Sequence, residues 1–200
     1  MLLPKLRVLV LLVASGWLAP AVPAQAPKDP QAAYEPRSAP GAGQKFLEKF
    51  AGDWDVAKTF YPRSGEPVRV KGECRQTMIN GGRFLRSEFV FGEGAARTTG
   101  LGLIGFEADS GKFTSVWVDS RSTRMSLRQS ADKFNGEEIR LVSRSLDEGG
   151  GRRHSRTVTR LEDGGRKIVH RQYAVGADGK ERLMMELVLT RKAKPLPVAK

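Results

Sequence analysis

The chain has 200 residues and a formal net charge of +12, with 34 Lys and Arg against 22 Asp and Glu. This length suits one domain with appendages, and a hydrophobic content of 40% excludes a protein with many membrane spans. The single cysteine excludes an internal disulfide framework and a zinc site built on paired cysteines.

Residues 1–24 have the pattern of a signal peptide. Lys5 and Arg7 flank the start of an apolar run over residues 8–18, and small residues then lead to Ala24, after which cleavage is expected. The apolar run is shorter than the roughly 20 residues that cross a bilayer. We therefore predict an exported protein, periplasmic or secreted, with no transmembrane span after cleavage. An uncleaved anchor is the alternative.

The next residues, 25–43, are rich in Pro and Ala and show no periodicity, which predicts a disordered linker. Residues 193–200 have the same character and are predicted to form a flexible tail. The folded domain is accordingly expected over residues 44–192. Its one predicted helix covers Gln44–Phe50, where Phe46, Leu47 and Phe50 share a face.

The rest of the domain alternates polar and apolar residues with a period of two, as in Leu183, Met185, Leu187 and Leu189. This pattern is typical of strands with one buried and one solvated face. Turn signals rich in glycine separate ten such segments, at residues 53–61, 67–78, 83–91, 97–106, 112–119, 123–130, 138–146, 154–162, 166–175 and 181–191. We predict an all-β fold, a single antiparallel up-and-down β-barrel of about ten strands, because closure leaves no unpaired sheet edge. A two-sheet sandwich is the alternative.

Several segments resemble a known family. They are FAGDWDV at 50–56, GGRFL at 81–85, the stretch from GLGLIGF at 100–106 to Thr123, and the end of the domain at 178–181 and 190–192. Over Lys45–Lys192 the chain resembles domain of unknown function 1579, an uncharacterised and mostly bacterial family. The resemblance implies a lipocalin-like, or calycin-like, barrel and no established activity.

Lipocalin-type barrels often carry Gly-x-Trp on the first strand and an arginine near the end of the last strand. Gly52, Trp54 and Arg191 match these places. Arg191 shares the parity of the apolar residues before it, so its guanidinium is expected to lie over the Trp54 indole. We predict that this pair closes the base of the barrel, which is a structural role.

The side chains expected to face the interior are mostly large and apolar: Trp54, Phe84, Leu101, Leu103, Trp117, Met125, Leu141, Met185 and Leu187. Large barrels leave room for a ligand, and ligand pockets are mostly apolar with a few polar anchors. The leading hypothesis is a non-enzymatic barrel that binds a small hydrophobic or amphipathic ligand inside. A filled interior is the alternative.

The candidate ligand-binding residues are Arg83, Trp117, Asp119, Met125 and His170. Trp117 and Asp119 share a strand face near a turn, and a buried carboxylate needs a partner. The expected partner of Asp119 is a hydroxyl or amide at residues 122–123, or Arg83. Asp119 is then either a turn cap or a polar anchor for the ligand.

A cavity enzyme of the hydrolase or isomerase type is an alternative, and it needs an acid–base set such as Asp119 with Arg83 or His170. No catalytic residue is assigned. The motif Gly100-x-Gly102-x-x-Gly105 has the spelling of a dinucleotide fingerprint, but it lies within a strand pattern and not at a strand–helix junction. No cofactor and no metal are predicted. Haem held by His170 is a minor alternative, because the similar nitrobindin-like barrels bind haem through one histidine.

Arginines alternate with other residues on three consecutive strands. Consecutive antiparallel strands usually pair, so the sequence predicts an arginine-rich outer face made by Arg124, Arg128, Arg140, Arg144, Arg156 and Arg160. Such a face favours an anionic glycan or lipid surface, and the alternative is a solvated exterior balanced by nearby acids. Export and the lack of interleaved aromatic residues argue against nucleic acid as a partner.

Overall fold

The computed structural model describes residues 29–34, 37–146 and 152–193. The chain divides into two compact units, residues 1–37 and 38–200. In the first unit, a turn covers residues 30–34, and Arg37 forms an ion pair with Asp29 at 2.6 Å. The predicted signal peptide lies outside the described residues, as do residues 147–151 and residues 194–200.

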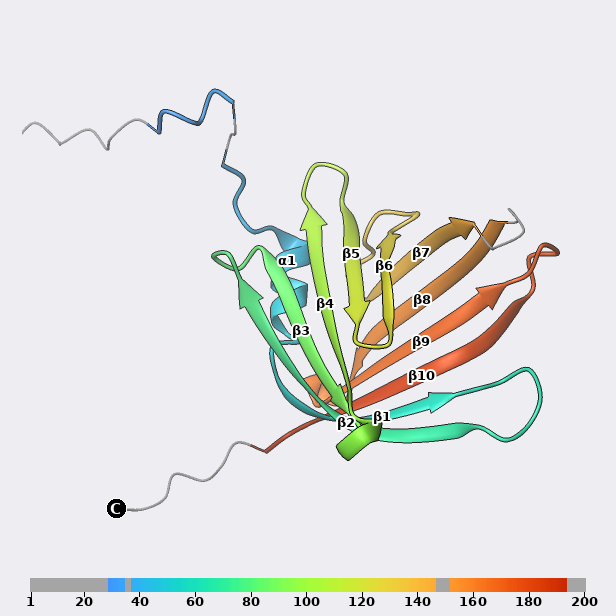
Figure 1. The fold of residues 1–200 in the computed structure, drawn as a ribbon. Coiled ribbons are helices and arrows are strands. Elements are labelled where there is room, and N and C mark those ends of the chain that lie inside the picture. Colours follow the sequence, from blue (N-terminus) through green and yellow to red (C-terminus); the bar gives the residue numbers. More distant parts are fainter. Residues whose placement is uncertain (1–28, 35–36, 147–151, 194–200) are drawn as a thin grey trace, which may run out of the picture. The chain divides into compact units, whose positions relative to one another are not determined.

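The second unit is a closed antiparallel barrel of ten strands, preceded by the helix α1 (Figure 1). The elements are α1 (Ala42–Glu48), β1 (Gly52–Phe60), β2 (Val68–Ile79), β3 (Phe84–Phe91), β4 (Thr98–Glu107), β5 (Lys112–Asp119), β6 (Ser122–Gln129), β7 (Glu138–Leu146), β8 (Arg152–Glu162), β9 (Lys167–Val175) and β10 (Glu181–Arg191). Each strand pairs with the next one in the sequence, and β1 pairs with β10. The predicted up-and-down barrel is therefore confirmed, and each strand begins and ends within two residues of its predicted limits.

Helix α1 begins at Ala42, two residues inside the segment predicted to be linker. Its apolar face is buried, with Phe46 at 7%, Leu47 at 0% and the following Phe50 at 2% exposure. The Gln44 side chain fixes the helix to the barrel, because its Nε2 donates a hydrogen bond of 2.7 Å to the carbonyl oxygen of Phe106. The helix contacts β2, β3 and β4 and covers the base of the barrel, the end at which β1 begins.

The inward face of β4 carries two glycines beside Trp117, at positions 100 and 102, where leucines were expected. Side chains opposite each other in a ladder lie on the same face, and Gly100 and Gly102 lie opposite Asp119 and the half-buried Trp117. A Cβ atom at Gly100 would clash with the edge of the Trp117 ring, so this position accepts only glycine without a shift of the indole.

The prediction was consequently wrong for four side chains. Phe84, Leu101, Leu103 and Met125 point outward and are 36%, 42%, 38% and 58% exposed. The core instead contains Leu85, the neighbour of Phe84, at 2% exposure, and Phe89, which lies opposite Gly100, at 7% exposure. Of the other predicted interior residues, Trp54, Leu141 and Leu187 are buried and Trp117 and Met185 pack against the core.

The wall of the barrel has one weakly joined place. The ladder between β6 and β7 consists of the single residue pair Gln129–Val142, whereas every other pair of neighbouring strands is joined by five or more residue pairs. The two strands run at an angle to each other in Figure 1. Loop residues 130–137 connect them at the base.

Candidate functional site

The base of the barrel is closed by Arg191 and Trp54, which are ladder partners. The guanidinium carbon of Arg191 lies 4.1 Å from the centre of the Trp54 ring. Its Nη1 donates to the carbonyl of Ala51 at 2.7 Å, its Nη2 to that of Lys49 at 2.8 Å and its Nε to that of Gly165 at 3.0 Å. All three nitrogens are thus used within the protein, so this guanidinium is structural and is not available to a ligand.

The interior just beyond this pair is filled by aromatic rings. Phe46 of α1, Phe106, Phe113 and Phe134 contact one another with ring centres 4.9–6.1 Å apart. Trp54 has no exposed surface, and its Nε1 donates to the carbonyl of Phe50 at 3.0 Å. The half of the barrel nearest the base is therefore packed core, and the opposite end of the barrel is its mouth.

At the mouth, Trp117 and Asp119 lie together on the inward face of β5. The Trp117 Nε1 donates to Asp119 Oδ2 at 2.9 Å, and the Arg121 backbone N–H donates to Oδ1 at 2.9 Å. The Trp117 hydrogen bond is the main cause that lowers the pKa of Asp119. The predicted pairing of Asp119 with Arg83 or with residues 122–123 was wrong. Its partners are its own strand neighbour and the turn amide of Arg121.

A lysine that was not predicted to face the interior also lies on the inward surface. Lys58 of β1 lies opposite the buried Leu187, with its Nζ 4.6 Å from the centre of the Phe60 ring and 4.5 Å from that of Phe91. Burial lowers the pKa of Lys58, while nearby Asp119 opposes this shift. The mouth thus combines aromatic rings with one ammonium and one carboxylate. The parity of Lys58 with Trp54 and Val56 is the sequence signal that could have placed it inside.

Arg128 also faces the interior. It lies opposite Ser115 in the β5–β6 ladder, on the face of Phe113 and Trp117, while its neighbours Leu127 and Gln129 are exposed. Burial lowers the pKa of Arg128. The prediction that this arginine belongs to the outer face was wrong, because the inward side of β6 carries Ser126 and Arg128 and the outward side carries the apolar residues.

His170 lies on the inward face of β9, as predicted for a ligand-binding residue. It pairs with Thr159 and Leu187 across the two ladders, and its Nδ1 lies 2.8 Å from Thr159 Oγ1. Burial, together with the positive charge of Arg128, lowers the pKa of His170 to about 4. The imidazole is therefore neutral at neutral pH.

This shift predicts a pH dependence of stability. The unfolded chain takes up a proton on His170 near pH 6.5 and the folded chain only near pH 4, so the contribution is complete above pH 6.5 and is lost as the pH falls towards 4. Between pH 7.5 and pH 5 we expect the unfolding free energy of the wild-type protein to fall by about 2 kcal/mol more than that of His170→Gln. Urea unfolding at both pH values measures it. An equal change in the matched variant His154→Gln would refute the assignment to His170.

The remaining candidates lie elsewhere. Arg83 belongs to the turn between β2 and β3, where it donates to the carbonyls of Asn80, Gly81 and Ser38, at the end of the barrel opposite Asp119. Met125 is on the outer surface. Three of the five candidates face the interior: Trp117, Asp119 and His170. A hydrogen bond joins the first two of these to each other.

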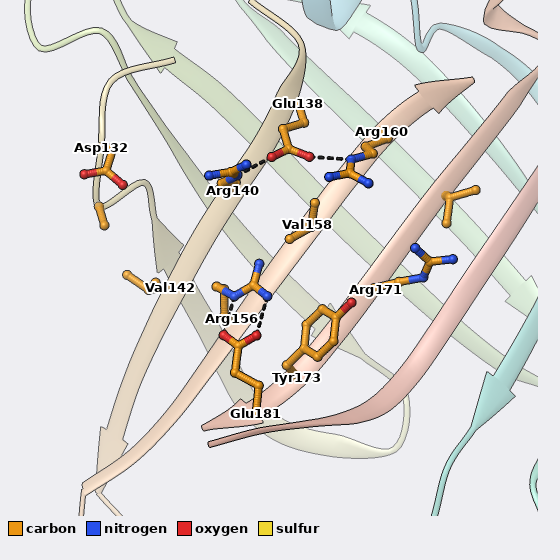
Figure 2. A pocket seen from close by; sticks show the side chains of 12 residues that line it. Asp132, Glu138, Arg140, Val142, Arg156, Val158, Arg160, Arg171, Tyr173 and Glu181 are labelled. Carbon is orange, nitrogen blue, oxygen red and sulfur yellow. Dashed lines mark hydrogen bonds and ion pairs between the residues drawn. The ribbon is translucent and has the colours of Figure 1, made fainter. Parts of the chain in front are cut away.

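The outer wall of β7–β9 carries a depression with a volume of about 470 Å³ (Figure 2). Its lining includes the predicted Arg140, Arg156 and Arg160, and also Arg171. Arg124 is exposed on β6, and the side chain of Arg144 is not among those the structure describes. An arginine-rich outer face is thus present, but its arginines lie on β7, β8 and β9 and not on the predicted strands β6–β8, and Arg128 is not part of it.

Each of these four arginines has a glutamate partner. Glu138 bridges Arg140 and Arg160, Glu181 binds Arg156, and Glu186 binds Arg171 at 2.7 Å. Burial raises the pKa of Glu138, but the hydrogen bonds from Arg160 and Arg140 outweigh this effect and hold that pKa below its usual value. Figure 2 shows Glu138 lying between Arg140 and Arg160, and Glu181 beside Arg156. The positive charge of this face is largely used in ion pairs.

Within the described ranges, no group of three His, Cys, Asp or Glu side chains is arranged to hold a metal ion. Cys74 is 3% exposed on the inward face, and burial raises the pKa of its thiol well above the usual value. In the part of the chain that the structure describes, no helix has the length and apolar character needed to span a membrane.

The sequence matches a family model described as "Protein of unknown function (DUF1579)" over residues 39–191. The chain belongs to this family. The resemblance seen in the sequence motifs is therefore confirmed. A search of curated proteins found no significant match.

Solved structures share the fold of this DUF1579 member. Rv2717c from M. tuberculosis matches with a TM-score of 0.55 and 13% identity, over 78% of this chain and 100% of that one. The S-type phycobiliprotein lyase CPES from Guillardia theta matches with a TM-score of 0.50 and 10% identity, over 76% of this chain and 93% of that one. Both are lipocalin-like barrels, and at these identities the likeness concerns the fold.

Proposed function

We propose that this DUF1579 barrel binds a small, partly apolar molecule inside, in the half nearest the mouth. The proposal rests on the difference between the inward residues at the base of the barrel and those near its mouth. The base is closed by Arg191 and packed aromatic rings, whereas the mouth half combines Phe91 and the half-buried Trp117 with Lys58. Ligand pockets typically pair an apolar lining with a few polar groups.

The likeness to the phycobiliprotein lyase supports a function based on binding, because a barrel of this fold serves as that lyase in Guillardia theta. The signal-peptide pattern of residues 1–24 supports a site of action outside the cytoplasm. An acid–base set for a cavity enzyme has less support, since Arg83 and Asp119 lie at opposite ends of the barrel and both Asp119 oxygens accept hydrogen bonds from the protein.

Two methionines provide a test of this location. Met185 lies on the inward face of β10 and packs against the core, whereas Met125 is 58% exposed on the outer face of β6. We expect Met185→Trp to fill the ligand space and weaken binding at least about tenfold, or about 1.4 kcal/mol, and Met125→Trp to leave binding unchanged. Calorimetric titration and thermal shift with fatty acids, fatty alcohols and a naphthalene dye measure it.

The Met125→Trp variant and the melting temperatures without ligand are the two controls. The melting temperature of each variant without ligand shows whether the larger side chain has disturbed the fold. If no compound in the panel binds the wild-type barrel, or if both variants weaken binding equally, the proposed interior site is wrong.

Haem is a second candidate ligand, and His170 is the residue that would hold it. The imidazole is neutral at neutral pH and has Nδ1 beside Thr159, which leaves Nε2 as the nitrogen for a metal. Bound haem would supply an iron centre for gas binding or redox chemistry. Haem belongs in the same titration panel, and a Soret band that His170→Gln leaves unchanged would exclude His170 as its ligand.

A further inference from the structure

The interior of the barrel has an uneven distribution of charge. Among the residues on the inward face of the described strands, Asp119 is the one carboxylate, and both of its oxygens accept hydrogen bonds from the protein at the mouth. Among the side chains that the structure describes, the cations with inward register are Lys58, Arg128, Arg182 and Arg191. Arg182 is exposed at the mouth and donates to the Tyr61 carbonyl at 3.0 Å. Arg191 is satisfied by three backbone carbonyls, and Lys58 has Asp119 and two aromatic rings nearby. Arg128 is the cation that lacks such partners.

Arg128 has a buried N–H group without a partner. Its Nε atom is buried and has no hydrogen-bond acceptor in the structure. The Nε atom of Arg86 is in the same state, but Arg86 forms an ion pair with Glu88 at 3.2 Å, and the four arginines of the outer depression each have a glutamate. No described carboxylate lies within ion-pair distance of Arg128. A buried N–H group of a cation without an acceptor is costly, and an acceptor supplied by another molecule would remove this cost.

A second group near the middle of the barrel is also incomplete. Thr157, on the inward face of β8, is 1% exposed, and its Oγ1 has no hydrogen-bond partner. In the ladders it lies between Leu141 of β7 and Gln172 of β9, so it shares the interior with His170, two residues before Gln172. Arg128 is close enough to His170 to act on its charge. Arg128 and Thr157 together offer unused polar atoms in one region of a mostly apolar interior.

We propose that Arg128 is the anion site of the interior, and that the ligand is an amphiphile whose carboxylate binds this guanidinium while its apolar part lies toward Trp117 and the mouth. The proposal rests on the proposed function and names the ligand class. A carboxylate fits because its two oxygens accept parallel hydrogen bonds from the guanidinium fork. The inward face offers the ligand no competing acid, since Asp119 is held at the mouth.

Pairs of compounds that differ only in the head group test the proposal. Dodecanoate and dodecanol carry the same linear chain, and 1-naphthylacetate and 2-(1-naphthyl)ethanol carry the same flat ring. We expect wild-type protein to bind the acid of at least one pair ten times or more tightly than its alcohol in calorimetric titration at pH 7.5. The pair that shows the difference identifies the shape of the apolar part.

Variants of two arginines on the same strand locate the site. Arg128→Gln should bind acid and alcohol about equally, with the alcohol affinity as in wild type, whereas the exposed Arg124→Gln should keep the preference for the acid. The melting temperature of Arg128→Gln without ligand should not fall, because the change removes a buried charge with no partner. Arg128→Met takes its place if the glutamine variant does not fold.

The outcomes separate this inference from the proposed function. If the wild-type barrel binds acids and alcohols equally, or if Arg128→Gln retains the preference, the anion site is wrong and interior binding stands. If Arg124→Gln loses the preference, the anion is recognised near the mouth and the assignment to Arg128 fails. If neither acids nor alcohols bind, the proposed function itself has failed.

Discussion

Replacing Arg191 by alanine is expected to lower the free energy of unfolding by about 3 kcal/mol, the largest loss we predict for one side chain. The change leaves three carbonyl groups, those of Lys49, Ala51 and Gly165, without their donor, and it removes the cation from the Trp54 ring. It also opens the base where the first and last strands meet. Urea unfolding followed by far-UV circular dichroism measures the loss.

Two further variants show whether geometry or charge matters at this position. Arg191→Lys keeps the charge but not the planar fork, so it should recover less than half of the loss. Arg75→Ala removes an arginine that pairs with Asp53 on the surface, where the Arg75 side chain is 71% exposed, and should leave the unfolding free energy almost unchanged. Full recovery by lysine would show that charge alone matters.

Gly100→Ala is expected to destabilise the barrel by about 1–3 kcal/mol through overpacking. The new methyl group would overlap the Trp117 ring, and moving the ring breaks its hydrogen bond to Asp119. Because the indole is part of the proposed ligand site, ligand affinity should fall as well. The indole N–H signal of Trp117 in NMR spectra and the unfolding free energy report the two effects.

Gly102→Ala is the matched control. It lies two residues further on the same strand and face, but its Cβ would be 3.4 Å from the Trp117 ring, which is ordinary contact. We expect a small change in stability and an unshifted indole signal. Equal effects at both glycines would mean that loss of glycine flexibility, and not the indole, explains them.

Much of the fold could be predicted because alternation and turn residues mark strands locally. The ten strands and the closing pair Trp54–Arg191 follow from the period-two pattern and from the resemblance to lipocalin-type barrels. When both faces of a strand carry apolar residues, however, the alternation of polar and apolar residues does not show which face is inside. On β4 the leucines at 101 and 103 suggested the wrong face, because the inner side carries glycines, and at Gly100 the Trp117 ring of the neighbouring strand fills the space that a side chain would take.

The candidate site was less predictable, since its main charges depend on pairing between strands. Arg128 was assigned to the outer face, and its true orientation depends on the register that places it opposite Ser115, in a ladder that has a register shift between Trp117 and Asp119. Arg156 pairs with Glu181, which is 25 residues away in the sequence. The sequence alone therefore did not predict that ion pairs neutralise the arginines of the outer face. The neutral state of His170 requires knowing how deeply it is buried.

The single residue pair between β6 and β7 gives the barrel a built-in line of weakness. Fluctuations that part the wall should start there, because little backbone hydrogen bonding has to be broken. Amide protons of β6 should consequently exchange with deuterium faster than those of β9, which is held by long ladders on both sides. Arg128 is one residue from this line, so a transient sideways opening would bring solvent, or an arriving anion, directly to its guanidinium without passage through the mouth.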